Sequence, residues 1–192
     1  MLNTSAITRV ALMAALTAVA AQITIPIFPV PFTLQVLAVI LSGFLLGPRY
    51  GALAQTIYVL IGAAGAPVFA EFSGGLGRVL GPTGGYLVAF PIAAAVAGLA
   101  TPTVARATRR RALWVASFWG CASLAVIYAI GAGWLAIVTE LPLAVAVAQG
   151  VLIFVPFDLI KVALAVLVAV ATAPAIATTD RRRSSGISGR VR

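Results

Sequence analysis

The stretch FVPFDLIKVALAVLVAV, residues 154–170, decides how the rest of the chain is interpreted. It is almost entirely apolar and Pro156 suits the first turn of a helix, so it predicts a helix within a membrane. Asp158 and Lys161 are three residues apart and therefore share one face of that helix. Charges in a membrane span are costly and usually face the bundle interior or a water-filled cavity. The pair is therefore either an internal lock between helices or part of a ligand site that offers an acceptor beside a donor.

The overall composition also indicates a membrane protein. Of the 192 residues, 62% are hydrophobic and 9% are charged, whereas soluble domains have about 25% charged residues. So few polar residues cannot cover a globule in water, and the length suits one compact helical domain. The sequence therefore predicts an all-α integral membrane protein embedded in the lipid bilayer.

Breaking residues divide the apolar sequence into six expected transmembrane helices. Their approximate ranges are 6–23, 33–47, 50–66, 83–101, 112–138 and 156–175. The first resembles a signal peptide, but no small-residue cleavage site leads into a soluble domain, so we expect a retained span. Residues 1–175 are expected to form a six-helix membrane domain, and residues 176–192 a basic, disordered cytoplasmic tail.

The basic residues predict the orientation of these helices. With the N-terminus inside, the cytoplasmic segments hold eleven of the thirteen basic residues, namely Arg9, Arg49, Arg106, Arg109, Arg110, Arg111 and the five arginines of the tail. The outer loops hold only Arg78. Because basic loops stay on the cytoplasmic side, we expect a multi-pass protein of the cytoplasmic membrane with both termini in the cytoplasm. This topology explains the net charge of +9 without a nucleic-acid partner.

The same orientation brings irregular segments together on the outer side. They are EFSGGLGRVLGPTGGYL at 71–87, which has six glycines, the proline-rich IPIFPVPF at 25–32, and the start of the last span. Glycine permits tight turns and a close approach to a ligand, although such a loop can also be a flexible connector. Irregular backbone at membrane depth is tolerated where it is buried or lines a cavity. We therefore expect the outer loops to form a ligand cavity that opens outward.

Several catalytic and nucleotide-binding sites are excluded by the residues present. The chain has no histidine and a single cysteine, Cys121, so it offers neither a histidine base or metal ligand nor an intrachain disulfide. The glycine-rich loop matches neither GxGxxG nor the Gly-Lys-Ser/Thr of a phosphate-binding loop. An intramembrane hydrolase using Ser73 or Asp158 would lack a second carboxylate at helical spacing. We expect no enzyme activity, no metal and no cofactor, and the chain does not power transport by itself.

Several motifs together resemble one known family. They are PVPFTLQ at 29–35, GPRYGALAQ at 47–55, GAPVFAEFSGGLG at 65–77, GPTGGY at 81–86 and PFDLIK at 156–161. In this order they resemble the BioY family, the biotin-specific S components of energy-coupling-factor (ECF) vitamin transporters. The resemblance implies a six-helix protein that captures biotin from outside with high affinity. It also implies partnership with a transmembrane coupling protein and two cytoplasmic ATPases.

The resemblance also implies positions for the ligand site. They lie in the glycine-rich loop, in GPTGGY, in the last span and near Gln35: Phe72, Ser73, Gly74, Gly75, Tyr86, Asp158 and Lys161. Arg78 is added on electrostatic grounds alone, because it is the sole cation of the outer loops and biotin is a carboxylate. Gln35 has a simpler interpretation as a helix-to-helix hydrogen bond.

A further implied site is the AxxxA helix-contact motif of S components on the first span. Ala11 and Ala15 have this spacing, and so do Ala14 and Ala18. Small residues four apart let helices pack closely, so ordinary packing inside the bundle is the alternative. An S component for another small vitamin, a homo-oligomer without the energising module and a membrane scaffold are the remaining alternatives.

The expected topology makes a first testable prediction. Single cysteines at positions 78 or 140 should react with an impermeant reagent added to intact cells, and cysteines at 49 or 109 should react only after the membrane is opened. The Cys121→Ser background serves as the control. Labelling of position 109 in intact cells would contradict the six-span topology.

Overall fold

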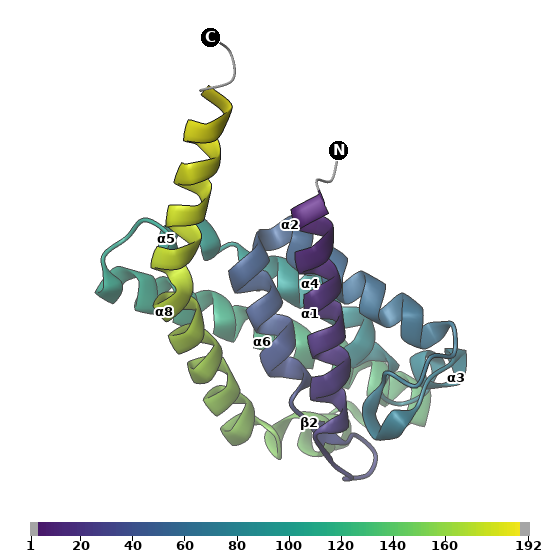
Figure 1. Cartoon of the computed structure of the whole chain (residues 1–192). Helices are drawn as coiled ribbons and strands as arrows, with labels where there is room; N and C mark the ends of the chain where they lie inside the picture. Colours follow the sequence, from purple (N-terminus) through teal and green to yellow (C-terminus); the bar gives the residue numbers. More distant parts are fainter. Residues whose placement is uncertain (1–3, 189–192) are drawn as a thin grey trace.

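The computed structural model describes residues 4–188, and the side chains of residues 4–173. Its order of elements is α1 (Thr4–Gln22), β1 (Thr24–Ile25), β2 (Phe32–Thr33), α2 (Gln35–Ala63), η1 (Ala70–Phe72), α3 (Leu76–Leu80), α4 (Gly84–Gly98), α5 (Thr101–Val104), α6 (Arg109–Thr139), α7 (Leu143–Val147), η2 (Ala148–Leu152) and α8 (Val155–Ser188). The expectation of a mostly helical protein with apolar spans is confirmed (Figure 1).

Within the described residues, five helices are long and apolar enough to cross a membrane. The expected spans 33–47 and 50–66 correspond largely to the two halves of α2. Gly47 has non-helical backbone in the middle of that helix (φ 79°, ψ 177°) and is followed by Pro48. Glycine tolerates positive φ, and proline has no N–H to continue the helical bonding. The breaker GPRYG is therefore a sharp turn at which α2 folds back on itself, because Gln55 after the turn donates to Ser42 before it at 3.1 Å and a methyl group on Gly51 would collide with Gly43.

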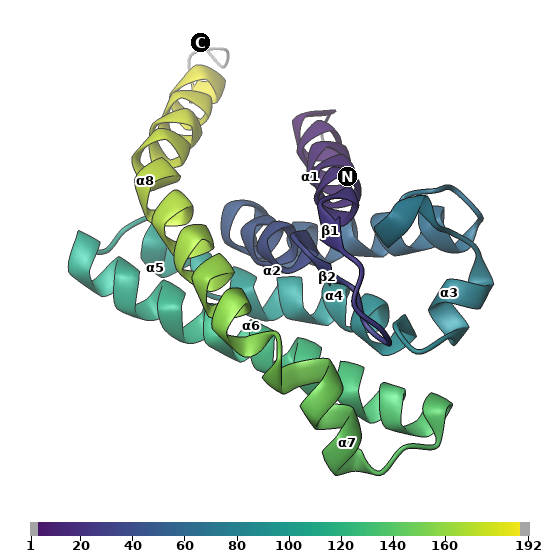
Figure 2. The same ribbon diagram turned by 90° about the horizontal axis from the view of Figure 1, so that it is seen from below.

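Helix α4 lies between α2 and α6 (Figure 2). A glycine sets the close approach of α2 and α4: a methyl group placed on Gly43 would collide with the carbonyl of Ala94 and with Ala97. In a bilayer, where lipid is as apolar as the helices, such small-residue contacts hold helices together by van der Waals packing.

A buried polar contact ties α1 to both halves of α2. The amide nitrogen of Gln55 donates to the hydroxyl of Thr17 at 3.0 Å and to that of Ser42 at 3.1 Å. All three side chains are fully buried. Hydrogen bonds between helices are modest in strength within membranes. These two nevertheless link α1 to the segments of α2 on both sides of Gly47.

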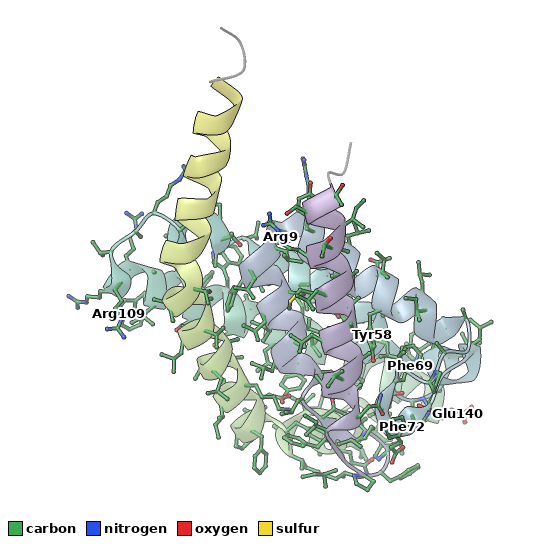
Figure 3. All side chains as sticks on the ribbon, viewed as in Figure 1. Arg9, Tyr58, Phe69, Phe72, Arg109 and Glu140 are labelled. Atoms are coloured by element: carbon green, nitrogen blue, oxygen red, sulfur yellow. The ribbon has the colours of Figure 1, made fainter. Side chains whose placement is uncertain are left out.

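The irregular segments gather at one end of the bundle. Strands β1 and β2 pair antiparallel, with Thr24 opposite Thr33, and the proline-rich segment connects them. Figure 3 places Phe72 and Glu140 at this end, on the lower right, whereas Arg9 lies at the upper centre and Arg109 on the left. The irregular segments therefore lie away from Arg9 and Arg109. Which side faces the cytoplasm stays a prediction.

The last helix enters the segment for which the sequence predicts a disordered tail. The backbone of α8 is helical to Ser188. The side chains of residues 174–192 lie outside those that the structure describes, and so does the backbone of residues 189–192. The basic cytoplasmic tail, residues 176–192, stays a prediction.

Candidate functional site

A pocket lies among α2, α4, α6, α8 and the irregular segments. It has about 680 Å³ of empty space, a volume that includes the open solvent at its mouth. Its walls are largely apolar, with a few convergent polar groups. Among the lining residues are Val30, Phe32, Phe69, Leu87, Phe90, Ile127, Phe154, Thr33, Gln35, Ser73, Arg78, Tyr86, Tyr128, Asp158 and Lys161.

The charged pair of α8 lies in this pocket. Lys161 Nζ is 2.5 Å from Asp158 Oδ1, and each residue is only 4% exposed. The ammonium also donates to the carbonyl of Thr33 at 2.6 Å and lies 3.7 Å from the centre of the Phe32 ring. Buried charges persist only when paired and hydrogen-bonded, and here strand β2 supplies the additional partners. The pair is thus both a link between α8 and β2 and part of the pocket wall.

Tyr128 of α6 completes this cluster, and the sequence analysis did not identify it. Its hydroxyl donates to Asp158 Oδ2 at 2.7 Å, so the two carboxylate oxygens have different protein partners. A tyrosine in an apolar span is usually interpreted as packing or as an interfacial residue. The available signal was the buried carboxylate itself, which needs a donor from a neighbouring helix.

Gln35 belongs to a hydrogen-bonded group at the start of α2. Its amide nitrogen donates to the Tyr58 hydroxyl at 2.6 Å, and its amide oxygen accepts from the Thr33 hydroxyl at 2.9 Å. Tyr58 in turn donates to the carbonyl of Val68 at 3.1 Å. Gln35 therefore lines the pocket and also ties β2 and α2 to the segment before the glycine-rich loop.

Tyr86 forms another wall, from the first turns of α4. Its hydroxyl donates to the carbonyl of Gly150 at 2.8 Å. A methyl group on Gly131 would collide with the Tyr86 ring, and one on Gly150 with its hydroxyl. Glycines in α6 and η2 thus provide the space into which this tyrosine packs.

The glycine-rich loop contributes only some of its expected residues to the pocket. Ser73 and Arg78 line it, whereas Phe72, Gly74 and Gly75 are not among the lining residues. Phe72 is 72% exposed. Gly75 has a positive φ of 91° and its N–H donates to the carbonyl of Gly62, while a methyl group on Gly74 would collide with the carbonyl of Ala66. In this structure the two glycines shape the loop backbone.

The loop is attached to α1 through Gln22. The side-chain oxygen of Gln22 accepts from the Phe72 N–H at 2.9 Å, and its nitrogen donates to the carbonyl of Phe69 at 3.1 Å. Near the mouth of the pocket, Arg78 pairs with Glu71 at 3.1 Å, both side chains about 40% exposed (39% and 40%). A guanidinium at this position is accessible to a ligand anion.

The two possible registers of the small-residue motif differ in exposure. Ala11 and Ala15 lie on the exposed face of α1. Ala14 is only 6% exposed and belongs to a cluster of buried apolar side chains in the core. Ala18 packs against this cluster. Only the first register is therefore available to a partner helix. Among the residues that the structure describes, no group of three or more His, Cys, Asp or Glu side chains could hold a metal ion.

Comparison with known proteins identifies the family. A model of the BioY family matches residues 1–178. The chain belongs to the BioY family. The resemblance inferred from the five motifs is thereby confirmed.

Individual relatives agree with this assignment. A "Probable biotin transporter BioY" of Pyrococcus horikoshii is 49% identical over 160 residues, which cover 83% of this chain and 91% of the relative. The "Biotin transporter BioY" of Thermotoga maritima is 47% identical over 155 residues, covering 81% and 88%. These BioY relatives are transporters, not enzymes, and the apolar helices make this chain a multi-pass membrane protein.

A solved structure has the same fold. The crystal structure of the S-component for biotin from an ECF-type ABC transporter matches this BioY chain with a TM-score of 0.77. The two sequences are 28% identical, and the match covers 87% of this chain and 89% of the other.

The ion pair makes a prediction about stability. Lys161→Met should lower the free energy of unfolding by about 3–5 kcal/mol, because it leaves the Asp158 carboxylate buried without its cation. The double variant Asp158→Asn with Lys161→Met should recover part of this loss. Thermal unfolding of the ligand-free protein in detergent measures both, with Arg49→Met, at an exposed arginine, as the control. A Lys161→Met protein that melts with the parent would show that the pair does not stabilise the fold.

Proposed function

We propose that this protein is the substrate-binding S component of a biotin uptake system. The observation that carries the proposal is a largely apolar pocket whose buried end holds Asp158 and Lys161 side by side. The names of the BioY relatives and of the matching crystal structure support the choice of ligand.

The chemistry of the ligand suits these residues. The ureido ring of biotin has two N–H donors and one carbonyl acceptor, and an ionised carboxylate only accepts whereas an ammonium only donates. Within the described part of the chain, Lys161 gives two of its three N–H donors to Asp158 and Thr33, which leaves one for the ureido oxygen. The carboxylate oxygens of Asp158 have further lone pairs for the ureido N–H groups.

The remaining parts of biotin find matching surfaces. Its fused rings and thioether are apolar, and Phe32, Phe154 and Tyr86 line the pocket with aromatic surface. The valerate carboxylate requires a cation or backbone N–H donors. Arg78, half-exposed near the mouth, provides the cation, and the glycine-rich loop with Ser73, Gly74 and Gly75 provides a backbone that closes over the ligand. Phe72 covers the same mouth after loop rearrangement.

The membrane arrangement that accompanies this function has six spanning segments. They are α1, the two halves of α2, α4 with α5, α6 and α8. Both termini lie in the cytoplasm, and the ligand pocket opens outward through the cytoplasmic membrane. The exposed arginines Arg9, Arg49 and Arg109 support this orientation, since basic segments stay inside.

Energy for uptake comes from partner proteins in this proposal. A transmembrane coupling protein with two cytoplasmic ATPases docks on the face of α1 that exposes Ala11 and Ala15. Alanines spaced by one helical turn allow a partner helix to approach closely, and the exposure of these two residues supports this register over Ala14 and Ala18.

A binding measurement tests the proposed ligand site. Asp158→Asn keeps the shape of the side chain but replaces a charged acceptor, and such hydrogen bonds are worth about 1.5–3 kcal/mol. The affinity for biotin should therefore fall by about one to two orders of magnitude. Isothermal titration of the purified variant, corrected for its folded fraction, measures the change.

Glu140→Gln, the same chemical change at an exposed residue that does not line the pocket, is the matched control and should bind as the parent does. If Asp158→Asn melts early but its folded fraction binds biotin as tightly as the parent, Asp158 is structural. Titration with a panel of other vitamins separates biotin from another specificity, and no saturable binding of any vitamin would favour a scaffold.

The docking face can be tested separately. Ala11→Leu and Ala15→Leu should leave biotin affinity unchanged but prevent co-purification with the coupling protein, because the added bulk blocks a close helix contact without reaching the pocket. Ala163→Leu, an exposed alanine on α8, is the matched control. Normal assembly of both α1 variants would show that partners dock elsewhere.

A further inference from the structure

A second hollow lies at the opposite end of the molecule from the ligand pocket. It is an open groove of about 1030 Å³ between the α5–α6 connection and α8. Val104, Ala105 and Ala112 form one wall, and Leu167 and Val170 form the other. Figures 1 and 2 both show α8 beside this connection. The groove is apolar along its walls and has one charged lining residue, Arg109.

Positive charge is concentrated in the α5–α6 connection and the first turn of α6, next to this groove in the sequence. Arg106, Arg109, Arg110 and Arg111 are all exposed. None of them has an ion-pair partner among the residues whose side chains the structure describes. The acidic residues in that part of the chain are elsewhere: Glu71 and Glu140 lie at the loop end and Asp158 lies in the pocket.

The first turn of α6 adds unsatisfied donors at the same place. The N-cap residue, Thr108, makes no side-chain capping hydrogen bond. The first backbone N–H groups of a helix have no acceptor within the helix, and together with the helix dipole they favour an anion. In this 31-residue helix they are found beside an arginine cluster and an apolar groove.

We propose that this groove is a binding site for one anionic phospholipid. The acyl chain lies between the α5–α6 connection and α8, and the phosphate is held by Arg109 and the N-terminus of α6. An amphipathic anion matches both features, since apolar walls alone would accept any lipid and exposed arginines alone would attract the membrane surface without a defined site. The proposal is independent of the ligand bound in the outer pocket.

Native mass spectrometry of the full chain in detergent tests the site, with phosphatidylglycerol or phosphatidylcholine as the added lipid. The parent should retain one phosphatidylglycerol in preference to phosphatidylcholine. Arg109→Gln should weaken retention of phosphatidylglycerol about fivefold, because one arginine near an anionic surface contributes about 1 kcal/mol. Arg49→Gln removes an exposed arginine outside the groove and should leave retention unchanged.

A second pair of variants tests the apolar part of the site. Ala171 lies on the groove wall, so Ala171→Leu should reduce retention of phosphatidylglycerol, whereas Ala163→Leu, on the same helix outside the groove, should not. Biotin affinity measured on all four variants reports whether each one is folded. Equal retention of the two lipids, equal effects of Arg109→Gln and Arg49→Gln, or equal effects of the two leucine variants would each overturn the proposal.

Discussion

The arrangement of the pocket depends on one constraint, the need to stabilise two opposite charges within a membrane-embedded bundle. Asp158 and Lys161 cannot be buried unless each has additional partners. Those partners come from two separate parts of the chain: Tyr128 from α6, and the Thr33 carbonyl with the neighbouring Phe32 ring from β2. The contacts that stabilise the ion pair therefore also hold β2, Tyr128 and the start of α8 around one cavity. The residues that stabilise the charges are the same residues that line the site.

Small residues let the helices around the ion pair pack closely against one another. The contact of Gly43 with α4 brings two helices close enough to enclose the pocket, and Gly131 and Gly150 leave room for the ring of Tyr86. At these positions a larger side chain would collide with its neighbours, whereas the backbone conformation itself does not require glycine. Gly47 is different, because its positive φ allows α2 to kink while its two halves keep their packing.

Much of this arrangement could be predicted from the sequence. Apolar runs predicted a mostly helical protein with membrane-spanning segments, and the spacing of Asp158 and Lys161 placed them on one helix face, which lines the pocket. Tyr128 could not be found in the same way, because its partner is 30 residues away and only tertiary packing brings the two together. The break at Gly47 and Pro48 could be predicted from the backbone preferences of these residues, but the packing of the two segments of α2 against each other could not. Local sequence also could not separate Ala11 and Ala15 from Ala14 and Ala18, since that choice depends on which face of α1 meets α2.

The attachment of the glycine-rich loop to Gln22 has a mechanical consequence. Gln22 is the last residue of α1, and it holds the loop by both ends of its amide, through Phe69 and Phe72. The glycine-rich loop is consequently tied to the end of the first helix and does not move independently of it. Any rotation or axial slide of α1 strains these bonds or carries the loop along, so the mouth of the pocket follows the position of α1.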